Sequence, residues 1–172
     1  MDFFDVTAQR GSYRGEFLDA PIPEADLRKI LQAAIQAPSG YNFQTTTFAV
    51  VTDKALLQAL AALMPMPATQ TAPAIIVALS EHVVQKANGL SFETEDYAAA
   101  TENLLLAATA LGYGAVWMDG MTKLHGNAEK IKALLNIPAG KTVRTIVPLG
   151  KPKEPVAQRE KKPLSERVTF YK

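Results

Sequence analysis

Ala37-Pro38-Ser39-Gly40-Tyr41-Asn42-Phe43-Gln44 separates two clear patterns in this sequence. Before it, apolar residues recur at the spacing of a helix with one buried stripe: Leu27, Ile30, Leu31, Ala34 and Ile35. After it, the run Phe48-Ala49-Val50-Val51 predicts a strand. Ser39, Asn42 and Gln44 bring a hydroxyl and two amides to the junction, just past the proline that ends the helix. Such groups suit a ring with many hydrogen-bond donors and acceptors, although they can equally satisfy their own turn.

The composition is that of an ordinary globular protein. The chain has 172 residues, of which 48% are hydrophobic and 20% are charged, so we expect one domain spanning residues 1–172. Lys and Arg number 18 against 17 acidic residues, which gives a weak overall field. That balance favours neither nucleic acid nor an anionic membrane as a partner.

The chain contains no cysteine, which excludes disulfides, thiolate-bound metals and thiol nucleophiles. The first residues, Met1-Asp2-Phe3-Phe4-Asp5, lack the basic and then apolar pattern of a signal peptide. The most apolar helical stretch, around residues 97–111, is interrupted by Glu102 and Asn103 and is shorter than the roughly 20 residues that cross a bilayer. We therefore expect a soluble, cytoplasmic protein.

Helices and strands are predicted along the whole chain. The predicted helices are residues 2–9, a helix opened by Pro23, residues 54–63, residues 91–111 with Thr94 as its cap, and a helix capped by Asn127. The predicted strands are residues 48–51, 74–79, 115–118, 143–149 and 167–171. Residues 64–73 are expected to be a Pro- and Ala-rich connection without regular structure.

Two of these elements point beyond a single chain. The helix over residues 91–111 is apolar nearly all round, so we expect close packing against another helix, either of this chain or of a second subunit. The segment from Lys151 is rich in Pro and Lys, and the strand predicted after it needs a sheet edge to pair with. That edge can belong to a partner subunit.

No side chain stands out as a nucleophile or a general base. His82 and His125 are far apart in the sequence and are interpreted as surface residues rather than metal ligands. The sequence contains none of the common hydrolase, zinc-helix or phosphate-loop motifs. We therefore expect no catalytic residue in the acid–base sense and no metal, and an enzyme of this kind would take its chemistry from a cofactor.

Three segments are candidates for holding such a cofactor. Arg10 and Arg14 flank Ser12, and arginines bind phosphate oxygens well, although this pattern alone is more often a solvated turn. Trp117-Met118-Asp119-Gly120 ends a predicted strand and opens a loop, where ligands commonly bind. The segment from Lys151 to Arg167 has an excess of basic residues that suits a phosphate or a solvated linker.

Taken in order, these motifs resemble the FMN-dependent nitroreductase family over essentially the whole chain. Arg10, Ser12 and Arg14 match its Arg-x-Ser-x-Arg/Lys segment, and residues 37–44 match its Ala-Pro-Ser-x-x-Asn-x-Gln motif. Further matches are the central dimer helix, the strand after it, and the C-terminal phosphate-binding element: residues 95–108, 112–118, 148–152 and 159–161.

The resemblance implies an α+β fold with a mostly antiparallel central sheet flanked by helices. It also implies a homodimer in which residues 151–172 form an arm that exchanges a C-terminal strand with the partner. FMN would lie at the dimer interface, where NAD(P)H gives it hydride and leaves. A nitroaromatic, a quinone or a similar flat acceptor then takes the electrons in a second step.

The resemblance also assigns the cofactor-binding residues. In the family, the motif at residues 37–44 reaches the flavin of the partner subunit, and a residue at the place of Gln70 lies near its pyrimidine edge. The implied FMN contacts are Arg10, Gly11, Ser12, Arg14, Pro38, Ser39, Asn42, Gln44, Gln70, Trp117, Met118, Asp119, Gly120, Arg159 and Lys161.

Three alternatives stay open at this point. The first is a family branch with another flavin reaction, such as dehalogenation, flavin fragmentation or ene reduction. The second is a flavin-binding store or sensor with little turnover, because Gly11 and Gln70 stand where many relatives have cations. The third is a structural dimer that binds no flavin.

Overall fold

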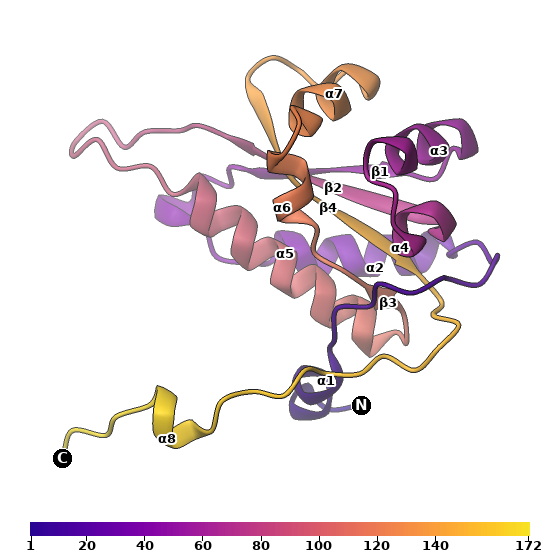
Figure 1. The fold of residues 1–172 in the computed structure, drawn as a ribbon. Coiled ribbons are helices and arrows are strands. Elements are labelled where there is room, and N and C mark those ends of the chain that lie inside the picture. Colours follow the sequence, from indigo (N-terminus) through magenta and orange to yellow (C-terminus); the bar gives the residue numbers. More distant parts are fainter.

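A four-stranded sheet forms the centre of the computed structural model, which describes residues 1–172 (Figure 1). The strands are β1 (Thr46–Val51), β2 (Ala74–Glu81), β3 (Gly114–Ala115) and β4 (Lys141–Gly150). Their order is β1-β2-β4-β3, and every neighbouring pair is antiparallel. The predicted α+β class with an antiparallel central sheet is confirmed.

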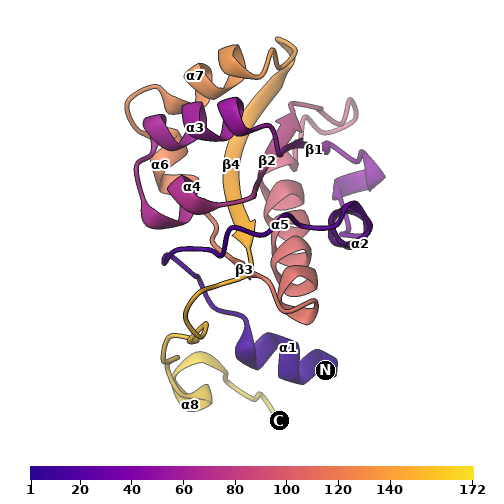
Figure 2. The ribbon, with the colours of Figure 1, turned by 90° about the vertical axis from the view of Figure 1, so that its right-hand side faces the viewer.

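Helices cover both faces of this sheet. They are α1 (Phe3–Gln9), α2 (Glu24–Ile35), α3 (Lys54–Leu63), α4 (Pro67–Thr71), α5 (Glu93–Ala110), α6 (Asp119–Lys123), α7 (Asn127–Leu134) and α8 (Leu164–Arg167), with a 3-10 turn, η1, at Gly40–Asn42. In Figure 2, α2 and α5 lie on one side of the sheet, and α3, α4, α6 and α7 lie on the other.

The alternation of side chains along β2 builds a core on each face. Ile75 and Val77 join the cluster under α3, α4 and α7, whereas Ala74 and Ile76 join the cluster under α2 and α5. All of β2 except its last residue is buried, as expected for a strand that is apolar throughout. β1 pairs only with β2, so its outer edge is free within the chain.

The central helix α5 buries one face rather than its whole circumference. Its buried residues are Asp96, Tyr97, Ala100, Thr101, Leu104, Leu105 and Ala108. On its other side Ala99 and Leu106 are only half-buried. The helix packs against α2, where the Asn103 amide donates to the Ala33 carbonyl at 3.1 Å. Packing against a helix of the same chain is therefore found, and packing against a second subunit stays a prediction.

The structure corrects two predicted helix caps. Phe92, not Thr94, is the N-cap of α5, and Thr94 lies inside the helix. Gly126, not Asn127, is the N-cap of α7. Its φ of 68° lies in the left-handed region, which glycine adopts readily. The side chain of Asn127 instead donates to the Met121 carbonyl at 3.0 Å, so it ties α7 to α6.

Two short helices replace predicted irregular segments. Residues 67–71 form α4, with Pro67 at its first position and Thr69 bonded back to the Met66 backbone. Residues 119–123 form α6, where a loop was expected. The strand predicted over residues 115–118 shrinks to β3, although Met118 still donates to the Ile146 carbonyl at 3.0 Å.

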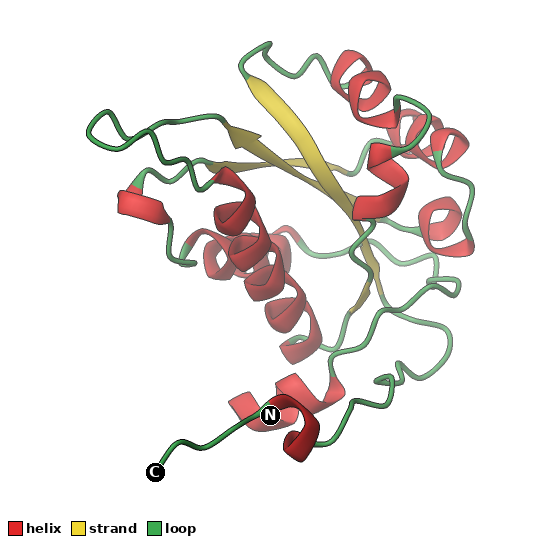
Figure 3. Ribbon diagram, turned by 60° about the vertical axis from the view of Figure 1, so that its left-hand side comes forward, coloured by secondary structure: helices red, strands yellow, loops and turns green.

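The strand predicted for residues 167–171 is not formed in the single chain. Arg167 ends α8, and residues 168–172 pair with no strand. The physical reason is that a strand needs an edge, and this segment runs away from its own sheet (Figure 3). None of the helices is long and apolar enough to cross a membrane.

Candidate functional site

The N-terminal turn, residues 10–17, lies beside the short edge strand β3. Ser12 forms a parallel bridge with Ala115, and the Tyr13 amide donates to the Ala115 carbonyl at 2.9 Å. The ring of Tyr13 is buried against Phe17, with 5.2 Å between the ring centroids. The fold therefore brings the turn next to the segment that follows β3, which contains Trp117 to Gly120.

The turn presents two guanidinium groups and a hydroxyl. Arg10 is largely buried, with Nε 3.5 Å from the Glu102 carboxylate of α5. Arg14 is exposed, and its closest polar contact is 3.4 Å from Nη1 to the Ser12 carbonyl. Ser12 is also exposed. This donor set fits a phosphate, because guanidinium groups bind phosphate oxygens in pairs.

The C-terminal segment crosses directly over Gly11. A Cβ atom at this position would lie 2.6 Å from the Ala157 carbonyl oxygen and 2.9 Å from Val156 Cγ1. Only glycine therefore leaves room for this crossing. Arg159 and Lys161 come two and four residues after Ala157 and are exposed. Their backbone therefore starts close to the N-terminal turn.

Tyr13 fastens the same crossing through its hydroxyl group. This hydroxyl donates to the Glu16 carbonyl at 2.6 Å. It also accepts from the backbone amides of Lys153 and Glu154, at 3.1 and 3.2 Å. A single buried side chain thus joins the N-terminal turn to the segment after β4.

The segment Trp117–Gly120 supplies an aromatic wall and an open backbone. The half-buried Trp117 meets Tyr97 edge-on, with 6.1 Å between ring centroids. Asp119 Oδ2 accepts from Lys123 at 2.8 Å, whereas its buried Oδ1 has no partner. A Cβ atom at Gly120 would meet nothing within 4 Å, so a ligand can approach this backbone closely.

The pKa values of two neighbouring side chains, Tyr97 and Lys123, are raised. Burial raises the pKa of Tyr97, and the Asp119 carboxylate adds to that effect. The hydrogen bond to Asp119 raises the pKa of Lys123 in turn. Near neutral pH the Tyr97 hydroxyl is therefore protonated and the Lys123 ammonium is charged.

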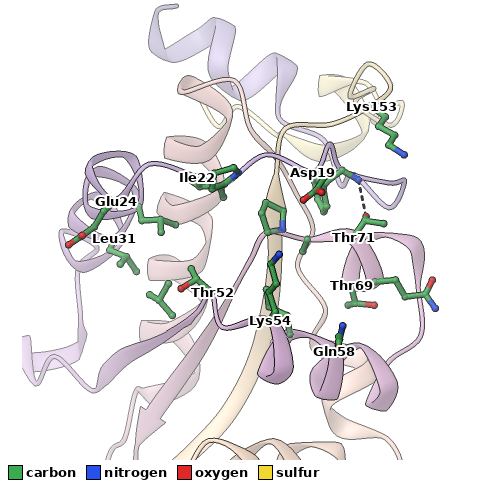
Figure 4. A pocket seen from close by; sticks show the side chains of 18 of the residues that line it. Asp19, Ile22, Glu24, Leu31, Thr52, Lys54, Gln58, Thr69, Thr71 and Lys153 are labelled. Carbon is green, nitrogen blue, oxygen red and sulfur yellow. Dashed lines mark hydrogen bonds between the residues drawn. The ribbon is translucent and has the colours of Figure 1, made fainter.

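Gln70 comes from α4 and is exposed. The helix is tied to the N-terminal turn because the Phe17 amide donates to Thr71 Oγ1 at 2.9 Å, the dashed line in Figure 4. Gln70 also lines a groove of about 1220 Å³ between α2, β1, α3 and α4. It is the only predicted site residue there, but Phe17 of the N-terminal turn and Lys153 of the segment after β4 also line the groove, so the groove adjoins the turn.

The loop at residues 37–44 is built from uncommon backbone conformations. Tyr41, Asn42 and Gln44 have φ values of 50°, 56° and 51°. For residues with a side chain, each left-handed conformation costs about 1–2 kcal/mol. The Ser39 hydroxyl accepts from the Gln44 amide at 3.0 Å and so helps to close the turn. Pro38 is exposed, as are Asn42 and Gln44.

This loop lies beside the start of α5, and the N-terminal turn lies near the other end of the helix (Figure 1). The loop contacts Asp96, and Arg10 pairs with Glu102. Six residues of helix place these two contacts about 120° apart around the axis and about 9 Å apart along it. Within one chain the fold therefore brings together the turn, the Trp117 segment and the C-terminal crossing, but not residues 37–44.

The residues around the turn fit FMN. Two guanidinium groups and a hydroxyl suit its phosphate, and the open backbone of Gly120 leaves room for a flat ring beside Trp117. The unpartnered oxygen of Asp119 is ready to accept a hydrogen bond from a ligand. No group of three or more His, Asp or Glu residues that could hold a metal ion occurs in the structure.

The sequence analysis missed the residues that hold these segments in place. Asp96 was covered only by the helix predicted over residues 91–111, whereas it bonds the loop through Gly40 and Thr45. Tyr13 and Thr71 hold the N-terminal turn through their hydroxyls. Their partners lie far away in the sequence, so no local pattern could have identified them.

Comparisons with known proteins place the chain among proteins of this fold. A protein of Methanothermobacter thermautotrophicus, provisionally named NADH dehydrogenase/NAD(P)H nitroreductase, is 33% identical over 161 residues, which are 93% of this chain and 82% of the relative. A provisionally named nitroreductase from Desulfovibrio desulfuricans, solved in complex with FMN, has a TM-score of 0.83. It is 27% identical, and the match covers 100% of this chain and 98% of that one.

A further structure and a family model agree. The structure of a nitroreductase family protein from Clostridium novyi is 31% identical, with a TM-score of 0.78 and coverage of 90% of this chain and 87% of its own. The model of the Nitroreductase family matches residues 7–65 and 58–151. With the fold, the site geometry and these matches in agreement, the chain belongs to the nitroreductase family.

Proposed function

We propose that this protein is an FMN-dependent oxidoreductase that takes hydride from NAD(P)H and reduces nitroaromatics, quinones or similar flat acceptors. The observation that carries the proposal is the convergence of Arg10, Ser12 and Arg14 with Trp117–Gly120 and the C-terminal crossing. The FMN bound to the Desulfovibrio desulfuricans neighbour and the NAD(P)H in the name of the Methanothermobacter relative support the same function.

The residues around the turn divide into three roles in this proposal. Arg10, Ser12 and Arg14 hold the phosphate and the ribityl chain, and Gly11 keeps their backbone close to the C-terminal segment that brings Arg159 and Lys161. Trp117 and Met118 form the wall behind the ring. Asp119, Gly120 and Gln70 meet its polar edges.

No side chain is proposed as an acid–base catalyst. When bound, FMN supplies the redox chemistry, accepting hydride from NAD(P)H in one step and reducing the acceptor in a second. The chain binds and orients: Arg10 is held by Glu102, and Trp117 is held against Tyr97. Rate enhancement then comes from placing substrate and cofactor face to face.

The proposed enzyme is a homodimer made of single-domain subunits. Pro38, Ser39, Asn42 and Gln44 lie by the start of α5, away from the N-terminal turn near its other end. We therefore assign them to the flavin of the partner. Residues 151–157 are held on their own chain by Tyr13 and by the crossing over Gly11. The rest of the partner's arm, residues 158–172, is proposed to pair with the free edge of β1, beside the groove of Figure 4. Val168 and Phe170 alternate along that arm and are exposed in the single chain. A cytoplasmic setting is part of this proposal, because the reductant NAD(P)H is found there.

The visible spectrum of the purified protein, before and after anaerobic NADH or NADPH, tests the function. We expect a bound-flavin spectrum that bleaches on addition of either nucleotide. Replacing Arg10→Ala or Arg14→Ala is expected to weaken FMN binding by about 1.5–3 kcal/mol, since each removes a charge-assisted contact. Lys130→Ala on the exposed side of α7 is the matched control. A parent protein that binds no FMN refutes the proposal.

The assembly is tested by removing residues 163–172. Light scattering after gel filtration is expected to show a dimer for the full chain and a monomer for the shortened one. Circular dichroism should show no loss of helix beyond the four residues of α8, because the removed residues are exposed and contact no core. A shortened chain that dimerises as tightly as the parent contradicts the exchange of the arm.

A second candidate function is a flavin store or sensor with little turnover. It is favoured by one observation: neither Gly11 nor the exposed Gln70 supplies a cation near the proposed flavin. In that case the protein binds flavin, but the spectrum remains that of oxidised flavin after either nucleotide is added.

A further inference from the structure

A buried carboxylate joins α5 to the loop at residues 37–44. Asp96 is 3% exposed, and its Oδ1 accepts from the Gly40 amide at 2.8 Å. Its Oδ2 accepts from the Thr45 hydroxyl at 2.6 Å. The two oxygens of one side chain thus hold both ends of the segment 40–45.

The surroundings of Asp96 are unusual for a residue that only supports the fold. No Lys, Arg or His pairs with it, so a buried charge is compensated mainly by these two hydrogen bonds. Charged groups are almost never buried without a partner, because their desolvation is costly. An apolar side chain would fill this place on the helix at lower cost, so the carboxylate points to a role in holding the loop.

The loop needs such an anchor because its own backbone is strained. Tyr41, Asn42 and Gln44 all have left-handed φ values. Such conformations persist only where the surrounding structure fixes them. From the other side, Phe92 covers Gly40 so closely that an added Cβ atom would lie 2.4 Å from the ring. The Asn88 amide also donates to the Tyr41 hydroxyl at 2.8 Å.

We infer that Asp96 is a positioning residue for flavin binding, which acts by fixing the backbone of residues 40–45 before the cofactor arrives. The inference rests on the proposed function, in which Ser39, Asn42 and Gln44 contact the partner's FMN. Asp96 touches none of the reacting atoms. It keeps the loop in the one conformation that presents these side chains, so binding does not have to order the loop.

Three variants separate positioning from simple stability. Asp96→Ala leaves the Gly40 amide and the Thr45 hydroxyl without a partner. Asp96→Asn keeps an acceptor for the amide and a group that the hydroxyl can bond. Thr101→Val is the matched control, because it removes a buried hydrogen bond to the Tyr97 carbonyl on the same helix and leaves the loop untouched.

Each variant is measured in two ways. Hydrogen exchange of peptides covering residues 39–45, in protein without FMN, reports the loop itself. For Asp96→Ala we expect exchange to accelerate about tenfold or more. Fluorescence titration with FMN reports binding, and we expect the dissociation constant to rise about tenfold. Asp96→Asn should recover most of both effects, and Thr101→Val should show neither.

The outcomes separate this inference from the proposed function. If the parent binds FMN and Asp96→Ala binds it equally well, or exchanges residues 39–45 no faster, the inference is wrong. It is also wrong if Thr101→Val weakens FMN binding as much as Asp96→Ala does, since the effect is then one of general stability. If the parent binds no FMN, the proposed function fails, and with it the flavin role of Asp96. If Asp96→Ala does not fold, Thr45→Val, which removes only the bond to Oδ2, decides the matter by the same measurements, with Asp96→Asn as its control.

Discussion

The N-terminal turn, residues 10–17, and the C-terminal arm, residues 158–172, look alike in the sequence. Both are basic, and both have little regular structure. In the fold they differ sharply. The turn buries Gly11, Tyr13 and Phe17, whereas every residue of the arm from Arg159 onward is exposed. The turn is therefore fixed by its own chain, and the arm is not.

The difference shows that irregular structure and loose structure are separate properties. Backbone bonds to β3, the hydroxyls of Tyr13 and Thr71, and the crossing over Gly11 fix the turn without a helix or a strand. Arg10 and Arg14 are thus presented before any ligand binds. Arg159 and Lys161 lie just beyond the last fixed point, so their positions depend on what the arm contacts.

The largest effect is expected for Gly11→Ala. The added Cβ atom would lie 2.6 Å from the Ala157 carbonyl oxygen, so the turn and the crossing segment must move apart. We expect the free energy of unfolding, measured by urea titration without FMN, to fall by about 1–3 kcal/mol. Gly140→Ala is the control, because nothing lies within 4 Å of a Cβ atom there. Equal stability of the two variants would show that the crossing is not tight.

A smaller loss is expected for Tyr13→Phe. The change keeps the ring and removes a hydroxyl that makes three hydrogen bonds. The Glu154 amide then loses its acceptor, whereas the Lys153 amide keeps the Glu16 carbonyl at 3.1 Å. The loss should cost about 1–2 kcal/mol of unfolding free energy. Tyr171→Phe makes the same chemical change in the arm, where the residue is 95% exposed, and should cost nothing measurable. A similar loss from both variants would remove the contrast between the turn and the arm.

The loss of stability in acid should depend on Glu93, at the start of α5, more than on Glu16 in the turn. Hydrogen bonds from Ser91 and then His82 lower the pKa of Glu93 to about 2 from its ordinary 4.5. Because the folded pKa is the lower one, this stabilisation is complete above about pH 4.5 and is lost as the pH falls toward 2. We expect Glu93→Gln to remove about 1 kcal/mol of this pH-dependent stabilisation, measured by comparing thermal unfolding at pH 6 and at pH 2.5. The contact with Lys153 also lowers the pKa of Glu16, but both side chains are exposed to solvent, so Glu16→Gln should change this pH profile much less.

The smallest effect is expected for Lys153→Met. Lys153 Nζ lies 2.6 Å from Glu16 Oε2, and this contact raises the pKa of the lysine, but both groups are in contact with solvent. Exposed ion pairs contribute little because water and salt screen them. The backbone amide that bonds Tyr13 is kept, so urea titration should give the parent's stability within error. A clear loss would mean that the ion pair, rather than the Tyr13 hydroxyl, holds the crossing.

The sequence predicted those elements whose pattern is long enough to repeat. The helix expected over residues 54–63 has the same bounds in the structure, and β2 extends the predicted strand by two residues. α4 and α6 have five residues each, which is too short for a helical period to be seen. The arm was predicted to contain a strand from its alternation alone, but alternation creates no partner edge.

For the candidate site, the sequence identified residues with ligand-binding chemistry and missed those that hold them in place. Arg10, Ser12 and Trp117 carry recognisable chemistry in short motifs. Asp96 and Gly40 are 56 residues apart, and Tyr13 and Lys153 are 140 apart. Such pairs become visible only when the fold brings them together.

The free edge of β1 has a consequence for handling the protein. An unpaired strand of six residues offers a row of amide and carbonyl groups to any other strand, including the same strand of another molecule. Val50 is exposed on this strand, and no Lys, Arg, Asp or Glu interrupts Thr46–Val51. If the partner's arm covers this edge, dilution that separates the subunits also uncovers a surface prone to aggregation. The fraction of chains with an uncovered β1 edge should therefore rise as the protein is diluted below the dissociation constant of the dimer.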